Sequence, residues 1–195
     1  MRSPVSIGAR ILGTGAALLI LFLLVGFLLS GKWEADGTLV IAAEPTELFP
    51  LLESPEGWRR WTPWPDSGLV ASGPSSGPGA RMSWNDPNLG DGVFEILETE
   101  SPHLVRYKVS VQDSTMRTEG SLRLAPDSAG TRISWVERGD FGRNPLMGYW
   151  ALAMHRSQGR ELEKSLVKLA ELVGDSSAAA RAAAADSTEM EEPVP

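Results

Sequence analysis

The sequence contains no cysteine and only two histidines, His103 and His155. Without cysteine there is no disulfide framework, no thiol nucleophile and no cysteine zinc site. Two histidines leave little for a histidine-based metal site. A phosphate-binding glycine loop and a Ser/His/Asp arrangement are also missing, since the glycine-rich run 73–79 lacks the Lys-Ser/Thr ending and precedes a strand pattern. We therefore expect neither a metal nor a cofactor.

Basic charge is also scarce. Eighteen Lys and Arg residues against 25 Asp and Glu residues give a formal net charge of −7, with no basic block. Such a chain repels phosphate, which excludes nucleic acid as a partner. Hydrophobic residues at 42% and charged residues at 22% are ordinary for a globular protein. This composition excludes both wholesale disorder and a polytopic membrane protein, and the length suits one main domain.

A long uncharged run lies near the N-terminus, at residues 11–30. As a helix this run would span about 30 Å, the thickness of a bilayer core. The alternative is a cleaved signal peptide, whose apolar region is shorter and ends in small residues, whereas Leu28 and Leu29 stand here. The sequence thus predicts a transmembrane anchor at 11–30 after a short cytoplasmic N-terminus, residues 1–10.

The orientation of this anchor follows from the basic residues beside it. Arg2 and Arg10 precede the run, whereas Lys32 is the only basic residue that follows it before Arg59. Because positive flanks stay in the cytoplasm, we expect a single-pass membrane protein whose main domain lies on the outer, periplasmic or extracellular side.

Residues 174–195 are rich in alanine and acidic side chains and contain almost no large apolar residue. They cannot bury enough surface to offset their ordering entropy, so we predict a disordered acidic tail. A continuation of the preceding helix is the alternative, which Gly174 argues against. Residues 36–173 remain as the folded domain.

Within this domain, apolar and polar residues alternate over several short runs, which is typical of an antiparallel sheet with one buried face. Strands are predicted at 38–43, 69–71, 80–85, 92–98, 104–111, 116–124 and 131–138. Short helical pieces follow the first strand. Asn144 and Pro145 open a last helix that runs to about Val173 with one apolar stripe. The order predicts an α+β fold in which a curved antiparallel sheet wraps around a long C-terminal helix, with an internal cavity between them.

Several segments together resemble the SRPBCC superfamily, the START-like proteins that include the polyketide cyclase/dehydrase and lipid transport proteins. They are IAAEPTELFPLLES, WRRWTPW, WNDPNLGDGVFEILETESPHLVRYKV, GTRISWVERGDF and NPLMGYW. The resemblance covers residues 38–173 and implies the helix-grip fold. It names no single function, because the superfamily includes lipid carriers, hormone receptors and cyclases. It has no universal catalytic motif, so no catalytic residue is carried over.

The candidate ligand-binding residues are those whose parity or helical spacing turns them toward the cavity. They are Trp84, Tyr107, Gly120, Trp135, Glu137, Met147, Ala151, Met154 and His155. Gly120 leaves room inside the sheet, so Gly120→Leu is expected to fill the cavity with little loss of stability. Glu137 continues the inward parity of Trp135. Alternatively the strand ends there and Glu137 is solvated, which the rarity of buried glutamate favours.

Trp58, Trp61 and Trp64 recur at every third position across a proline-containing turn. They form either an aromatic lid at the mouth of the cavity or a plug at one end of the sheet, and tryptophan's usual packing role favours the plug. His155 lies near the edge of the apolar stripe, where it faces either the cavity or the boundary with solvent.

The sequence favours a membrane-anchored binding or carrier domain for a hydrophobic or amphipathic, lipid-like small molecule. A cyclase or dehydratase that uses Glu137, His155 or Tyr107 as acid and base is a second possibility. A ligand-free interaction module that presents its tryptophan-rich edge is a third. Beyond the small molecule and the membrane, no partner is indicated, and the oligomeric state stays open.

Overall fold

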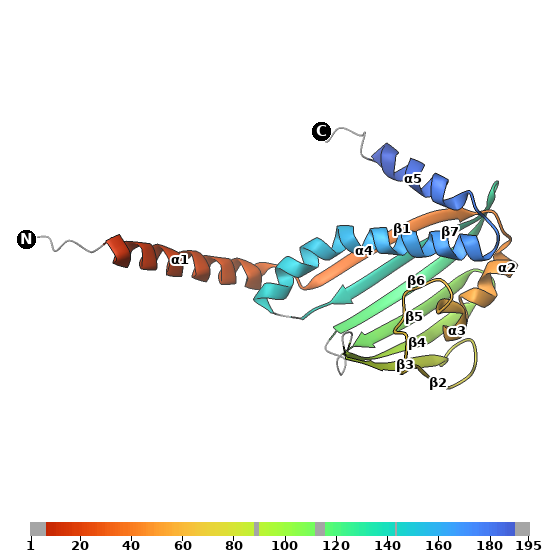
Figure 1. Ribbon diagram of the computed structural model, residues 1–195, viewed down its shortest axis with the longest axis horizontal. Helices are drawn as coiled ribbons and strands as arrows, with labels where there is room; N and C mark the ends of the chain where they lie inside the picture. Colours follow the sequence, from red (N-terminus) through yellow and green to blue (C-terminus); the bar gives the residue numbers. More distant parts are fainter. Residues whose placement is uncertain (1–6, 88–89, 112–115, 143, 190–195) are drawn as a thin grey trace, which may run out of the picture.

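The structure of the protein is a computed structural model that describes residues 7–87, 90–111, 116–142 and 144–189. One sheet of seven antiparallel strands forms the body of the domain, in the order β1-β7-β6-β5-β4-β3-β2 (Figure 1). The strands are β1 (Lys32–Ile41), β2 (Val70–Ser72), β3 (Arg81–Asp86), β4 (Gly90–Glu100), β5 (Leu104–Val111), β6 (Met116–Asp127) and β7 (Gly130–Asp140). All seven predicted strands are present.

The first and last strands are longer than the sequence pattern predicts. β1 begins at Lys32 rather than residue 38, because Trp33 and Ala35 continue its alternation of buried and exposed positions. β7 continues to Asp140 beyond the predicted end at 138, paired with β1 on one side and β6 on the other. The buried parity of β7 therefore extends past Trp135.

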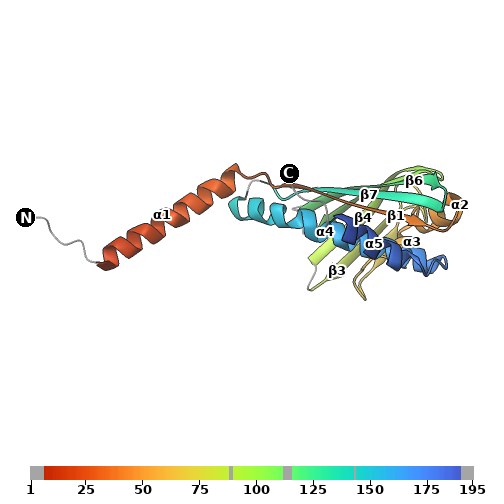
Figure 2. The ribbon, with the colours of Figure 1, turned by 90° about the horizontal axis from the view of Figure 1, so that it is seen from above.

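The long helix α4 (Pro145–Leu172) lies across one face of the sheet, as Figure 2 shows from above. The Asn144 side chain caps it by accepting a hydrogen bond of 2.9 Å from the backbone N–H of Leu146. Its second half buries Leu162, Leu166 and Leu169 against the sheet. An antiparallel sheet that grips a C-terminal helix confirms the predicted α+β architecture.

Three short helical segments connect β1 to β2 and cover the same face of the sheet as α4. They are α2 (Pro45–Leu48), the 3-10 turn η1 (Phe49–Leu51) and α3 (Pro55–Trp58). Ser54 caps α3 by accepting a hydrogen bond of 3.1 Å from the backbone N–H of Gly57. This cap determines where α3 begins. Trp58 is the last residue of α3, so the cap also helps to position its side chain against the sheet.

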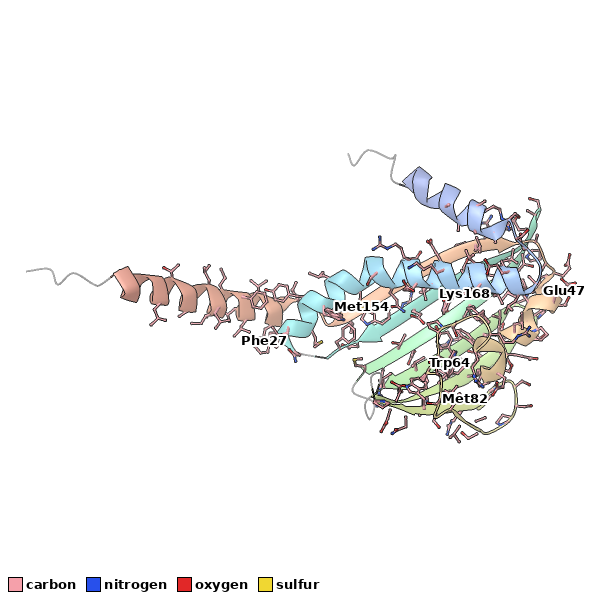
Figure 3. The ribbon with its side chains drawn as sticks, in the orientation of Figure 1. Phe27, Glu47, Trp64, Met82, Met154 and Lys168 are labelled. Carbon is pink, nitrogen blue, oxygen red and sulfur yellow. The ribbon has the colours of Figure 1, made fainter. Side chains whose placement is uncertain are left out.

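At the N-terminus, helix α1 (Ile7–Leu28) extends away from the sheet (Figures 1 and 2). Large apolar side chains such as Phe27 project from it into solvent (Figure 3). Among the helices as far as the structure describes them, none is long and apolar enough to cross a membrane.

The C-terminal end of α1 crosses the start of α4 at close range. The rings of Phe22 and Tyr149 stack with centroids 4.4 Å apart, and the Tyr149 hydroxyl donates to the backbone carbonyl of Phe22 at 2.8 Å. A Cβ atom at Gly148 would lie 2.6 Å from Cβ of Leu29, so glycine permits this approach. The first turns of α4 thus pack on α1.

After Val173 the structure differs from the predicted disordered tail, because helix α5 (Ala178–Glu189) forms there and Ala178 is buried. Asp175 anchors the segment, since its carboxylate accepts a hydrogen bond of 2.9 Å from the backbone N–H of Ala42. Arg181 pairs with Asp175 and donates to the backbone carbonyl of Val40 at 3.0 Å.

Burial alone would raise the pKa of Asp175, but these hydrogen bonds and the guanidinium lower the pKa to about 2. No local sequence pattern indicates this pair of a buried aspartate with a partly exposed arginine, and the high helix propensity of alanine favours the helix that follows. Residues 190–195 of the predicted tail lie outside the described residues.

Candidate functional site

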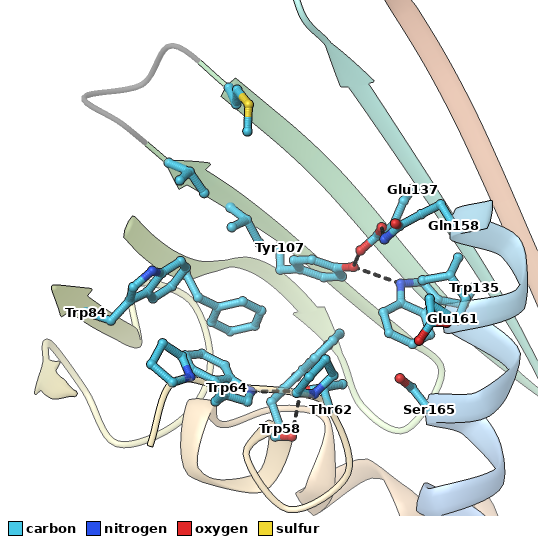
Figure 4. Close-up of a pocket in the computed structure, with 17 residues that line it drawn as sticks. Trp58, Thr62, Trp64, Trp84, Tyr107, Trp135, Glu137, Gln158, Glu161 and Ser165 are labelled. Carbon is cyan, nitrogen blue, oxygen red and sulfur yellow. Dashed lines mark hydrogen bonds between the residues drawn. The ribbon is translucent and has the colours of Figure 1, made fainter. Parts of the chain in front are cut away.

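A cavity of about 540 Å³ lies between the sheet, the segment that follows α3 and the middle of α4 (Figure 4). Its lining residues are Trp58, Thr62, Pro63, Trp64, Pro65, Trp84, Phe94, Tyr107, Val109, Val111, Met116, Trp135, Glu137, Gln158, Glu161, Leu162 and Ser165. The exposed members Pro63, Met116 and Glu161 mark where the cavity reaches the surface.

Aromatic rings form the wall of this pocket opposite α4. Trp58 is only 2% exposed, and its ring centroid lies 4.6 Å from that of Tyr107, 5.0 Å from Phe94 and 5.5 Å from Trp135. The indole N–H of Trp58 donates to the backbone carbonyl of Leu52 at 2.6 Å, which fixes the ring in one orientation.

The three regularly spaced tryptophans divide between the two roles that the sequence left open. Trp58 and Trp64 line the pocket, whereas Trp61 is buried outside the lining, with its indole N–H donating to the carbonyl of Leu51 at 3.2 Å. Trp64 meets Trp84 edge to face at 5.7 Å, across the pocket from Glu137 (Figure 4). The same turn therefore fills one end of the sheet and supplies rings to the cavity wall.

A hydrogen-bonded polar cluster stands among these rings: Trp135, Tyr107, Glu137 and Gln158. The Trp135 indole donates to the Tyr107 hydroxyl at 2.8 Å, and that hydroxyl donates to the Glu137 carboxylate. Gln158, on α4, donates to the other carboxylate oxygen at 3.0 Å (Figure 4). One donor from β5 and one from α4 thus meet at the carboxylate of Glu137, and the Trp135 indole supports the first of them.

Glu137 is 7% exposed, so the favoured expectation of a solvated side chain was wrong. The longer β7 keeps the inward parity of Trp135 through position 137. Burial raises the pKa of Glu137, and the hydrogen bonds from Tyr107 and Gln158 oppose that rise. Burial, with the Glu137 charge, also raises the pKa of Tyr107 well above its ordinary value, so the phenol keeps its proton and remains a donor. The cluster can accept a hydrogen bond or a proton at Glu137.

Gly120 does not line the pocket, because the ring of Tyr107 lies over it. The two residues are cross-strand partners, and a Cβ atom at Gly120 would lie 2.1 Å from Cζ of Tyr107. Trp84 covers its partner Gly92 in the same way. A glycine opposite an aromatic residue on a neighbouring antiparallel strand is therefore the signal of a covered glycine, not of open space.

The wall that α4 supplies comes from further along the helix than the sequence predicts. Met147, Ala151 and Met154 are not among the lining residues. The turn around Gly148 packs on α1, whereas Ala151 is buried in the hydrophobic core and Met154 packs against that core. Gln158, Glu161, Leu162 and Ser165 take their place. Gln158 lies on the otherwise apolar stripe of the last helix, and a polar residue at such a position was the sequence signal that it faces the pocket. The side chain of His155 lies outside the described ones.

Among the residues that the structure describes, no cluster of three or more His, Asp or Glu side chains forms a metal site.

Comparisons with known proteins place this geometry in a family. A family model described as "Polyketide cyclase / dehydrase and lipid transport" matches residues 32–174. No curated protein matches the chain.

Among solved structures, a protein of Mesorhizobium loti shares 18% identity at a TM-score of 0.53 and covers 73% of this chain and 98% of its own. The di-domain ARO/CYC StfQ from the steffimycin biosynthetic pathway shares 15% identity at a TM-score of 0.52, covering 78% of this chain and 52% of its own. At these identities the likeness concerns the fold alone. With a family model that spans the whole sheet and α4, the chain belongs to the polyketide cyclase/dehydrase and lipid transport family.

Proposed function

We propose that the protein binds a hydrophobic or amphipathic small molecule in the pocket between the sheet and α4. The observation that carries the proposal is a cavity of about 540 Å³ with aromatic walls and one buried polar cluster. Ligand pockets have this size and this mixture of apolar surface with a few polar groups. Apolar ligand surface buried against the rings would supply affinity at about 25 cal/mol per Å².

The test of this proposal is native mass spectrometry of the purified full chain, compared with a variant whose pocket is filled. Val109 lines the pocket, so Val109→Trp is expected to abolish retention of a bound small molecule. Val93 lies on the opposite face of the neighbouring strand β4, and Val93→Trp serves as the matched control that retains it. Equal occupancy in both variants would place any bound molecule elsewhere.

An acid–base reaction in the same pocket is the second candidate, supported by the buried carboxylate of Glu137 beside the Tyr107 phenol. A carboxyl group with a raised pKa suits proton transfer near neutral pH. Measurement of product formation distinguishes the two candidate functions. A catalytic Glu137 predicts a product whose formation Glu137→Gln abolishes, whereas a carrier releases its ligand unchanged.

We also propose that residues 11–30 hold the domain at a membrane, with the N-terminus in the cytoplasm and the domain on the outer side. The absence of charge in this run and the exposure of Leu12, Leu19 and Phe27 in α1 support the proposal, because exposed apolar surface of this extent calls for an apolar partner. The basic residues before the run support the orientation.

The position of the pocket suits a domain held in this way. Val111 pairs with Met116, and both line the pocket at the end of their strands. Arg117, next to Met116, pairs with Asp140, which in turn pairs with Lys32 at the start of β1. The pocket thus reaches the end of the sheet from which α1 departs, the end nearest a membrane that holds α1 (Figure 1).

Fractionation of cells that express the full chain tests the membrane proposal. The full chain is expected to stay with membranes through an alkaline wash, and a chain that begins at Gly31 is expected to be released. Protease added from the outer side should cut the domain. Release of the full chain by the wash would contradict the anchor, and protection from protease would contradict only the orientation.

A further inference from the structure

The charged side chains that line the pocket are both acidic among the described residues. Glu137 and Glu161 line it, and no lysine, arginine or histidine is among the described lining residues. Glu161 stands at the exposed rim, where Lys164 pairs with it at 2.7 Å. Glu137 is the buried member, and no cation among the described residues pairs with it. An anionic group that entered the pocket would lose its hydration and meet the Glu137 carboxylate, which no cation among the described residues neutralises.

The hydrogen bonds around Glu137 run in one direction. The Trp135 indole and the Tyr107 phenol donate in series toward one carboxylate oxygen, and Gln158 donates to the other. Each carboxylate oxygen can accept two hydrogen bonds, so acceptor capacity remains at Glu137. The phenol's single proton is already used, and the Gln158 amide has given one of its two N–H groups to the carboxylate. The charged group at this end of the pocket is therefore an acceptor, the Glu137 carboxylate.

Two further donors on the aromatic wall, at Thr62 and Trp64, are occupied within the protein. The Thr62 hydroxyl donates to the backbone carbonyl of Trp58 at 2.8 Å, and the Trp64 indole donates to the Thr62 hydroxyl at 2.7 Å. The Trp84 indole N–H is without a partner among the described residues, but it lies across the pocket from Glu137 (Figure 4). The Ser165 hydroxyl also lines the pocket, but Glu137 is the buried charged acceptor, so a ligand donor finds its charged complement there.

Resting on the proposed binding function, we propose that the bound molecule carries a hydrogen-bond donor, a hydroxyl or a protonated amine, which points at Glu137. Molecules whose polar end is a carboxylate or a phosphate are excluded. A neutral or cationic amphiphile places its apolar body against Trp58, Trp64 and Phe94 and its donor on the carboxylate. A protonated amine also supplies a positive charge, which none of the described side chains brings to the buried carboxylate.

Three probes with the same unbranched alkyl chain test this assignment: decanol, decylamine and decanoate. Their binding to the full chain, kept soluble in an amphipathic polymer, is followed by intrinsic tryptophan fluorescence, since four indoles line the pocket. Decanol and decylamine are expected to bind, and decanoate to bind at least about tenfold more weakly, because a buried charge without a partner is costly. This comparison uses the unaltered protein and needs no variant to fold.

Glu137→Gln then assigns the selectivity to one side chain. The amide still accepts a hydrogen bond but carries no charge, so decylamine is expected to lose about tenfold in affinity and decanol less than about threefold. Glu119→Gln removes the same charge from the exposed face of β6 and is expected to change neither probe.

The outcomes separate the two proposals. Decanoate binding as tightly as the other probes would overturn the donor assignment and leave the pocket as a binding site. An equal loss of decylamine affinity in Glu119→Gln would also overturn it, since net charge would then be the cause. Failure of all three probes to bind would count against the proposed binding function itself.

Discussion

Trp58→Ala is expected to lower the free energy of unfolding by about 3–5 kcal/mol, the largest effect of any single substitution considered for this domain. Trp58 is buried at the junction of α3 with the sheet, where its ring meets those of Trp61, Phe94, Tyr107 and Trp135. Alanine removes all four ring contacts and leaves the carbonyl of Leu52 without its indole donor. The substitution also removes one of the rings that line the cavity.

Urea unfolding monitored by circular dichroism measures this loss. Trp150→Ala is the matched control, because Trp150 is 60% exposed on α4 and its removal is expected to change stability by no more than about 0.5 kcal/mol. A similar small change for Trp58→Ala would mean that the aromatic cluster is not part of the folded core.

Gly120→Leu is expected to destabilise the protein by about 1–3 kcal/mol or more, the reverse of what the sequence alone predicts. Even a Cβ atom would meet Cζ of Tyr107 at 2.1 Å, so the new side chain must displace the ring from the glycine. That movement breaks the hydrogen bonds that join Tyr107 to Trp135 and Glu137. The substitution is therefore expected to lower the free energy of unfolding and to disrupt the hydrogen-bonded cluster at the same time.

A double-mutant cycle identifies the collision as the cause. Gly120→Ala is expected to be costly in the unaltered protein and far less costly when Tyr107→Ala has already removed the ring. Gly13→Ala in α1 meets no atom within 4 Å and controls for the general effect of replacing glycine. Additive costs at Gly120 and Tyr107 would rule out steric conflict between them.

Alternation along the chain was sufficient to predict the strands and the order of the elements. β5 was predicted with its observed bounds, since Val105 and Tyr107 alternate with Arg106 and Lys108 on a strand with one buried face. The cap at Asn144 likewise determined where α4 begins. These are local signals, and local physical chemistry is what a sequence carries directly.

Placement of the site depended on contacts between distant segments. Glu137 is buried because β7 is paired on both sides at this position, with Ala35 of β1 and Gly120 of β6, and Gln158 reaches it only through the way α4 crosses the sheet. The space above Gly120 is filled because Tyr107, its partner on the neighbouring strand β5, places its ring there.

By itself, then, the sequence determined the fold class, the strand pattern and most of the aromatic residues around the pocket, because periodicity and capping act within one segment. Only the tertiary structure decided which turn of α4 faces the pocket and that Asp175 anchors the C-terminal helix. Register and helix crossing set those outcomes, and both arise from packing between residues far apart in the chain.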